Sequence, residues 1–89
     1  MRNSCKRALR VYMSRRFKQE RREAGLTQSQ FADKLLMDLR SYAALEKGKN
    51  LCSTVTFAVY LTLLCEDPDV LIEELRQVLL DACQEATDD

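Results

Sequence analysis

The chain contains no histidine and no tryptophan, two glycines and one proline, and its four cysteines lie far apart. No two cysteines have the spacing of a zinc or redox motif, and no histidine is present to complete a metal site. There is no glycine-rich loop to hold a phosphate, and the neighbouring carboxylates Glu73 and Glu74 would not face each other on a helix. These absences predict a protein with no metal, no cofactor and no enzymatic activity.

Long hydrophobic runs are also missing. The longest apolar stretch, residues 55–65, is interrupted by Thr56 and Thr62 and is about half as long as the roughly 20 residues that cross a bilayer. The basic N-terminal segment is not followed by the apolar segment of a signal peptide. Four cysteines without a pairing pattern are typical of buried thiols in a reducing compartment. We therefore expect a soluble, cytoplasmic protein with no membrane partner.

The chain does contain enough material for one small helical domain. Its 89 residues leave no room for two separate hydrophobic cores. With 46% apolar and 31% charged residues, its composition is that of a folded protein rather than a disordered one. Because glycine and proline, two of the main turn residues, are scarce, we expect most of the chain to be helical.

Charge is distributed unevenly along the chain, although the net charge is zero. Residues 1–50 hold thirteen basic and five acidic side chains, a net charge of +8, whereas residues 51–89 hold Arg76 and nine acidic side chains, a net charge of −8. This asymmetry indicates a face that binds nucleic acid. Eight basic residues near the N-terminus either approach DNA phosphates or form a solvated face: Arg2, Lys6, Arg7, Arg10, Arg15, Arg16, Lys18 and Arg22.

The basic half begins with a long predicted helix. Apolar residues recur at helical spacing from residue 4 to residue 24, while basic residues fill the other faces. Gly25 follows, and glycine most readily adopts the left-handed conformation that ends a helix. The sequence leaves open whether residues 1–14 belong to this helix or form a flexible basic arm.

Two shorter helices are predicted next. Thr27 and Gln30 have the spacing of a capping box, in which each side chain binds the backbone N–H of the other residue, and the helix that they open extends to about residue 35. Asp38 is a favourable N-cap for a further helix at residues 39–47, and the glycine after it is the predicted stop. Two helices joined by so short a turn form a helix-turn-helix candidate.

The acidic half contains one ambiguous segment and one clear helix. Residues 55–64 alternate apolar residues as in a β-strand, but they fit a buried helix equally well by propensity. Because no other segment has the pattern of a strand with which they could pair, we predict a helix, capped by Ser53 or Thr54. An Asp-Pro pair opens the last helix, residues 68–84, whose apolar stripe is broader than one small domain buries. We expect this helix to pack on the core and to form a homodimer interface.

A continuous pattern of residues runs through the first three predicted helices. It begins with FKQERREAG at residues 17–25 and LTQSQFADKL at residues 26–35, and continues without a gap to Tyr42, Leu45, Glu46, Gly48 and Lys49. In this pattern the chain resembles the phage-repressor and Cro-like (Xre-type) helix-turn-helix family over residues 15–64. The resemblance implies an all-α, lambda-repressor-like domain of four to five helices, here with an extended N-terminal helix and an acidic C-terminal helix.

The resemblance also implies how the domain is organised. Residues 1–89 form a single domain in which residues 27–47 are the helix-turn-helix, and the third helix lies in the major groove of DNA. The family often has glycine in the turn, where this chain has Leu36 and Met37. Because leucine at a positive φ is strained, either the turn differs here or the second helix runs longer.

The candidate DNA-binding residues follow from the same resemblance. Gln28 matches a glutamine that binds DNA phosphate and steadies the recognition helix; the alternative is a helix-terminal amide that solvates only itself. Arg40 has the forked guanidinium that reads guanine bidentately, while its neighbours offer apolar contacts, so low sequence specificity is a real alternative. The full set is Gln28; Leu39, Arg40, Ala43 and Ala44 toward base edges; Ser41 and Lys47 toward the backbone; and Lys49.

Glu46 lies in the last turn of the predicted third helix, where its charge meets the negative end of the helix dipole and requires compensation. In the resembled family an arginine of the first helix pairs with this glutamate, and the matching residue here is Arg21. We therefore expect a structural salt bridge between Arg21 and Glu46 that holds the first helix against the third.

Two functions of different classes remain open. The first is a sequence-specific transcriptional regulator, a repressor of a bacterial or mobile-element operator, which binds double-stranded DNA as a homodimer on two half-sites. The second is a protein-interaction module on a helix-turn-helix scaffold, for example antitoxin-like, with weak or no sequence-specific DNA binding. The operator, the sign of regulation and any small-molecule effector cannot be read from the sequence.

Overall fold

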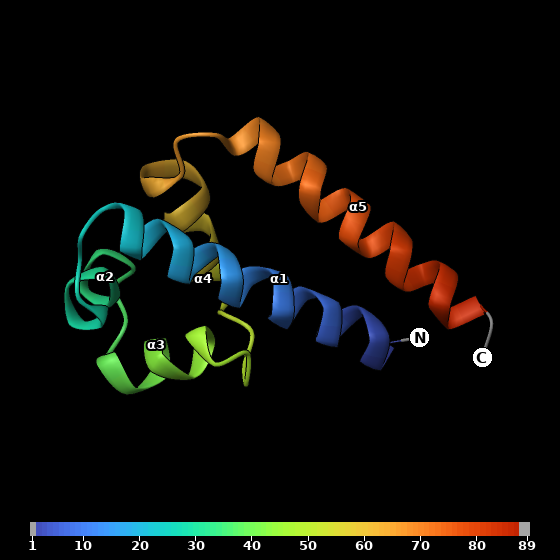
Figure 1. Cartoon of the computed structure of the whole chain (residues 1–89), viewed down its shortest axis with the longest axis horizontal. Helices are drawn as coiled ribbons and strands as arrows, with labels where there is room; N and C mark the ends of the chain where they lie inside the picture. The colour runs from blue at the N-terminus through green and yellow to red at the C-terminus, as the bar shows by residue number, and fades with distance from the viewer. Residues whose placement is uncertain (1, 88–89) are drawn as a thin grey trace.

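The computed structural model describes the backbone of residues 2–87 and the side chains of residues 3–84. Over this range the protein is all-α, as the sequence predicted, and no strand is present (Figure 1). Its elements are α1 (Arg2–Glu23), α2 (Gln28–Lys34), α3 (Leu39–Glu46), α4 (Thr54–Val59), the π-helical turn η1 (Tyr60–Leu64) and α5 (Pro68–Thr87). The ambiguous segment at residues 55–64 is therefore helical, and it widens into a π turn in its second half.

The long helix α1 separates the other elements into two groups. Helix α5 runs along one side of α1, and α2 and α3 lie on the other side (Figure 1). Because α1 is helical from its first described residue, residues 2–14 belong to this helix and are not a flexible arm, and Met1 lies outside the described residues. No helix within residues 2–87 combines the length and the hydrophobicity that a membrane crossing requires.

The core forms where α1 meets the helices on both sides. Phe17 of α1 is fully buried and packs edge-on against Tyr60, with ring centroids 5.0 Å apart. The ring of Phe31 from α2 lies 6.3 Å from that of Phe17 and 5.5 Å from that of Tyr42 on α3. Buried aromatic groups with such tilted arrangements stabilise a core beyond the area they remove from water. One aromatic cluster thus unites α1, α2, α3 and η1.

Three helices end with a residue in the left-handed conformation. Gly25 (φ 70°) follows α1, Leu36 (φ 60°) follows α2 and Gly48 (φ 74°) follows α3. After each of them a backbone N–H donates to the carbonyl five residues earlier, for example Met37 N to Ala32 O at 2.9 Å, which is the Schellman pattern. Helix α2 therefore does not run longer, and the turn does not change: Leu36 adopts the conformation that favours glycine.

The helix starts follow the predicted capping residues. The Thr27 hydroxyl accepts from Gln30 N at 3.1 Å, and Gln30 Oε1 accepts from Thr27 N at 2.9 Å. Asp38 Oδ2 accepts from Ser41 N at 3.0 Å at the start of α3, and Ser53 caps α4. Each of these bonds satisfies a free N–H in the first turn of a helix.

Candidate nucleic-acid interface

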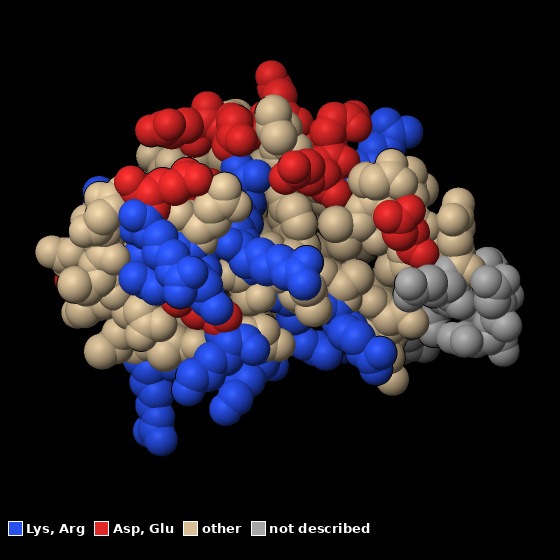
Figure 2. Space-filling view, in the orientation of Figure 1, with Lys and Arg blue, Asp and Glu red and all other residues tan. Residues whose placement is uncertain are grey.

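The acidic and the basic side chains lie on different sides of the fold. Figure 2 shows acidic side chains gathered along the side occupied by α5, and basic side chains across α1 and on the side occupied by α3. The acidic half of the sequence is thus held away from α3. Acidic side chains near α3 would repel the DNA phosphates. Because they lie on the opposite side, α3 is part of a positively charged surface.

Helix α3 has an outer face that reaches solvent and an inner face that is buried. Tyr42 and Leu45 are buried in the core and fix the helix against α1 and α2. The predicted base-facing and backbone-facing residues lie on the other side or just beyond the helix: Leu39, Arg40, Ser41, Lys47 and Lys49 are exposed, and Ala43 and Ala44 are half-buried. The predicted set is therefore brought together on one surface, with the exception of Gln28.

Gln28 points into the structure. Its Nε2 donates to Glu46 Oε1 at 3.1 Å, and its side chain is half-buried at the start of α2. This contact joins the first turn of α2 to the last turn of α3. The amide is thus tied to the end of the third helix, which is the steadying part of the role expected for it.

Arg21 and Glu46 form the ion pair expected from the sequence. Arg21 Nε lies 2.5 Å from Glu46 Oε2, and Arg21 Nη2 lies 3.1 Å from Glu46 Oε1. A third nitrogen, Nη1, donates to Leu26 O at 3.1 Å in the turn after α1. The hydroxyl of Tyr42 also donates to the Glu46 carboxylate. Glu46 is only 4% exposed, and Arg21, Gln28 and Tyr42 all donate to its oxygens.

The charge of Glu46 is maintained in spite of its burial. Loss of solvent alone would raise the pKa of this carboxyl, but hydrogen bonds from Arg21, Tyr42 and Gln28 outweigh that effect and hold the pKa below its ordinary value. Burial and the Glu46 carboxylate raise the pKa of Tyr42 well above its ordinary value, so its hydroxyl remains a donor. The network is a fully satisfied ionic anchor at the end of α3.

Comparison with known proteins identifies this arrangement. Residues 13–75, more than two thirds of the chain, match the helix-turn-helix domain family. The chain belongs to this family. Helix-turn-helix proteins place the second helix of the motif in the major groove of DNA, and here that helix is α3, so the chain is a DNA-binding protein. No curated protein and no solved structure matches it significantly.

The position of Arg16 corrects one expectation. The sequence predicted that Arg16, like the other basic residues of this segment, either approaches DNA phosphates or belongs to a solvated face. Its side chain is instead only 12% exposed and faces the acidic side of this helix-turn-helix domain. Its Nε donates to Tyr60 Oη at 2.7 Å, its Nη1 lies 3.3 Å from Glu74 Oε1, and its Nη2 binds Asp67. Arg16 thus joins α1 to η1 and to α5. A usable signal was its position three residues after Met13, which is buried on the inward face of α1.

Tyrosine hydroxyls complete this second polar network. Tyr12 Oη donates to Glu74 Oε1 at 2.6 Å, and burial together with that carboxylate raises the pKa of Tyr12 to about 12. Tyr60 donates to Glu20. The oxygens of Glu20 and Asp67 and the sulfur of Cys65 lie within 4.8 Å of one another, but the guanidinium of Arg16 contacts all three groups. The guanidinium of Arg16 is thus the cation that these three groups share.

Proposed function

We propose that the protein is a sequence-specific transcriptional regulator, a repressor that occupies an operator and carries out no catalytic step. The observation that carries this proposal is that α3 is anchored on one side and exposes cations on the other. Its inner side is anchored through Glu46, while Arg40, Lys47 and Lys49 are exposed and make no ion pair within the described residues. A fixed helix with unpaired cations on its outer side suits entry into the major groove.

Each residue of the α3 surface would take a distinct role on DNA. Arg40, in the first turn, would donate two hydrogen bonds to guanine O6 and N7. Leu39 and Ala43 would contact apolar base groups such as the thymine methyl. Lys47 and Lys49, at the C-terminal end, would neutralise phosphates and set the register without reading sequence. With one strong base contact per copy, a single domain would recognise few base pairs.

A homodimer would supply the missing affinity, and α5 offers a surface for it. The inner side of α5 is buried through Leu71 and Ala82. Its outer side leaves Ile72 53% exposed and Leu80 48% exposed. These belong to an apolar groove of about 420 Å³ lined by Phe57, Ile72, Leu75, Arg76, Leu79, Leu80 and Cys83, which we call the α5 groove. The predicted apolar stripe is thus divided between a buried and an open face.

We infer that a second copy of the chain covers the α5 groove. The groove is lined by α5 and Phe57 of α4, so its occupation leaves α3 free. Two copies related by a two-fold axis would present two α3 helices to half-sites about 34–36 Å apart. An apolar face of this kind on a DNA-binding domain is explained more simply by self-association than by exposure to water.

This function is tested by selecting the sequences that the protein binds from a random pool of DNA duplexes at a fixed salt concentration. We expect an enriched palindrome with a guanine at one position of each half-site. Arg40→Ala should weaken binding by about 1–3 kcal/mol and remove the preference at that position, whereas Lys47→Gln should weaken binding to all sequences equally. Lys34→Gln, which removes an exposed cation at the end of α2, outside both the α3 surface and the α5 groove, is the matched control and should bind as the wild type does.

The α5 groove also favours a second candidate function, a protein-interaction module that no longer reads bases. Under this alternative the pool would yield no enriched motif. Arg40→Ala would then change nothing, and the groove would hold a different protein. Enrichment of a palindrome that depends on Arg40 rejects the interaction module, and a featureless pool rejects the sequence-specific regulator.

A further inference from the structure

We propose that the first turns of α1 are a second DNA-contacting element of this protein, separate from the helix-turn-helix. Three cations on α1, namely Lys6, Arg7 and Arg10, form a strip, here called the α1 strip, which adjoins Lys47 and Lys49 at the end of α3. In this proposal the strip neutralises phosphates beside the base pairs that α3 enters. The inference rests on the proposed function and adds to it a contact outside the motif.

The basic residues of α1 fall into two classes by their partners. Arg16 and Arg21 form internal ion pairs with carboxylates. Lys6, Arg7 and Arg10 make no ion pair with any described residue, and Lys6 and Arg7 are exposed. Internal compensation therefore does not explain why the strip is basic, and a polyanion outside the protein would.

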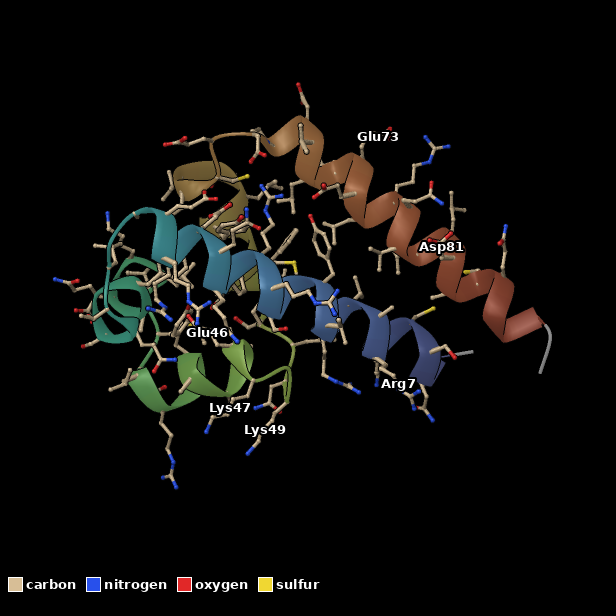
Figure 3. The ribbon with its side chains drawn as sticks, viewed as in Figure 1. Arg7, Glu46, Lys47, Lys49, Glu73 and Asp81 are labelled. Carbon is tan, nitrogen blue, oxygen red and sulfur yellow. The ribbon has the colours of Figure 1, made fainter. Side chains whose placement is uncertain are left out.

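The α1 strip adjoins Lys47 and Lys49 because the end of α3 lies against the middle of α1. A side-chain carbon built on Gly48 would lie 3.7 Å from Ser14 Oγ and 3.9 Å from Arg10 O. Lys47 and Lys49, which flank Gly48, are therefore held near Arg10. In Figure 3 the labelled Arg7, Lys47 and Lys49 lie on one side of the molecule, while Glu73 and Asp81 lie on the opposite side along α5.

Helical spacing extends the strip past the end of α3. Lys6 and Arg7 precede Arg10 by four and three residues, the spacing that places side chains on one face of a helix. A rise of about 1.5 Å per residue places Lys6 about 6 Å beyond Arg10, toward the start of α1. Because α3 ends near Arg10, the extension reaches DNA that α3 itself does not enter.

The distribution of charge in α1 is unfavourable for the helix alone. No acidic residue occurs before Glu20, and the first turn of α1 contains no acidic side chain. Cations at a helix N-terminus oppose the positive end of the helix dipole. Their mutual repulsion adds to this, since acids that would compensate them are absent from the same segment. Phosphates placed against the strip would reverse both effects.

Salt dependence of DNA binding separates the α1 strip from a merely solvated surface. The variant K6Q/R7Q/R10Q should lower the magnitude of the slope of log K against log[salt] by about 2 to 3, since each phosphate contact contributes about 0.9. The loss should be equal on the selected site and on random duplex. A charge-preserving variant, K6R/R7K/R10K, should keep the wild-type slope. Circular dichroism should show the same helicity for all proteins.

The matched control removes the same number of charges elsewhere. R15Q/R22Q/K34Q should keep the slope, because Arg15 and Arg22 lie about 140° and about 120° round the helix from Arg10, and Lys34 lies on α2. If the wild type binds a selected site but K6Q/R7Q/R10Q has the wild-type slope, the α1 strip is overturned and the proposed function stands. An equal loss in the control also overturns it. If the wild type selects no site, the proposed function itself fails.

Discussion

The guanidinium of Arg21 on α1 is paired with the carboxylate of Glu46 on α3 through two contacts of 2.5 and 3.1 Å. The same carboxylate accepts from Gln28 on α2 and from Tyr42. One buried acid therefore connects the three helices that form and support the helix-turn-helix. Its removal should affect the placement of α3 as well as stability.

Replacement of Glu46 by glutamine should lower the free energy of unfolding by about 1–3 kcal/mol. Hydrogen bonds to a charged group contribute about that much, and the amide would present a donor to groups that are themselves donors. The measurement is urea unfolding monitored by circular dichroism at pH 7. Glu66→Gln, which changes an exposed acid in the same way, should have almost no effect.

Arg21→Met should also destabilise the protein, but the two changes should not add. Either variant alone leaves buried polar groups without the partner they had, whereas the double variant R21M/E46Q removes the uncompensated charge. A double variant less destabilised than the sum of the single variants establishes the coupling. Additive effects would show that Arg21 and Glu46 act independently.

Stability should fall in acid partly through Glu46. The folded state holds the pKa of this carboxyl below its ordinary value, so the unfolded chain binds its proton more readily. The stabilisation is therefore fully present above the unfolded pKa, about 4.3, and is lost as pH falls through the lower folded value. Melting temperatures between pH 7 and pH 3 should decline less steeply for Glu46→Gln than for the wild type. Parallel curves would contradict this account.

Leu36→Gly should stabilise the protein by about 1 kcal/mol. Leucine at a φ of 60° carries a steric penalty of about 1–2 kcal/mol that glycine avoids. Glycine loses more chain entropy on folding, and this loss offsets part of the gain. Because the Leu36 side chain is 75% exposed, little packing is lost. Leu36→Ala keeps a Cβ and serves as the control: it should leave stability nearly unchanged. An equal gain in both variants would mean that backbone strain is not the cause.

Leu79→Asp should convert the proposed dimer to a monomer. Leu79 lines the α5 groove, and a carboxylate there would be desolvated in the interface and close to the acidic residues of α5. Light scattering after size exclusion, at tens of micromolar, should give two copies for the wild type and one for the variant. Leu63→Asp changes an exposed leucine outside the groove and should remain dimeric. A monomeric wild type would refute the dimer.

Helix boundaries proved predictable because the interactions that set them are local. The Thr27–Gln30 capping box, the Asp38 cap and the left-handed glycines lie where the sequence placed them. Each involves groups within three to five residues along the chain, so the neighbouring sequence contains both partners. The last helix, by contrast, runs to Thr87, beyond the predicted residue 84, because no glycine or proline near that point forces it to stop.

The charged residues show where the sequence was insufficient. Sequence alone established that the N-terminal half is basic and the C-terminal half acidic, and a family resemblance supplied Arg21 as the partner of Glu46. Only the tertiary structure distinguished Arg16, paired with Asp67 and Glu74 some fifty residues away, from arginines of α1 that face solvent. Helical periodicity describes one helix at a time, whereas the partner of a side chain depends on which helices pack against it.

The same distinction applies to the acidic half. Sequence determined that α5 is an amphipathic helix opened by Asp67 and Pro68, but its apolar stripe had no visible division. Packing against α1 decided that Leu71 and Ala82 are buried and that Ile72 remains open. Likewise, the pattern at residues 55–64 was compatible with a strand or a helix, and the burial of Tyr60 against Phe17 belongs to the helical form. Local propensity sets which elements can form, and long-range burial decides which faces they use.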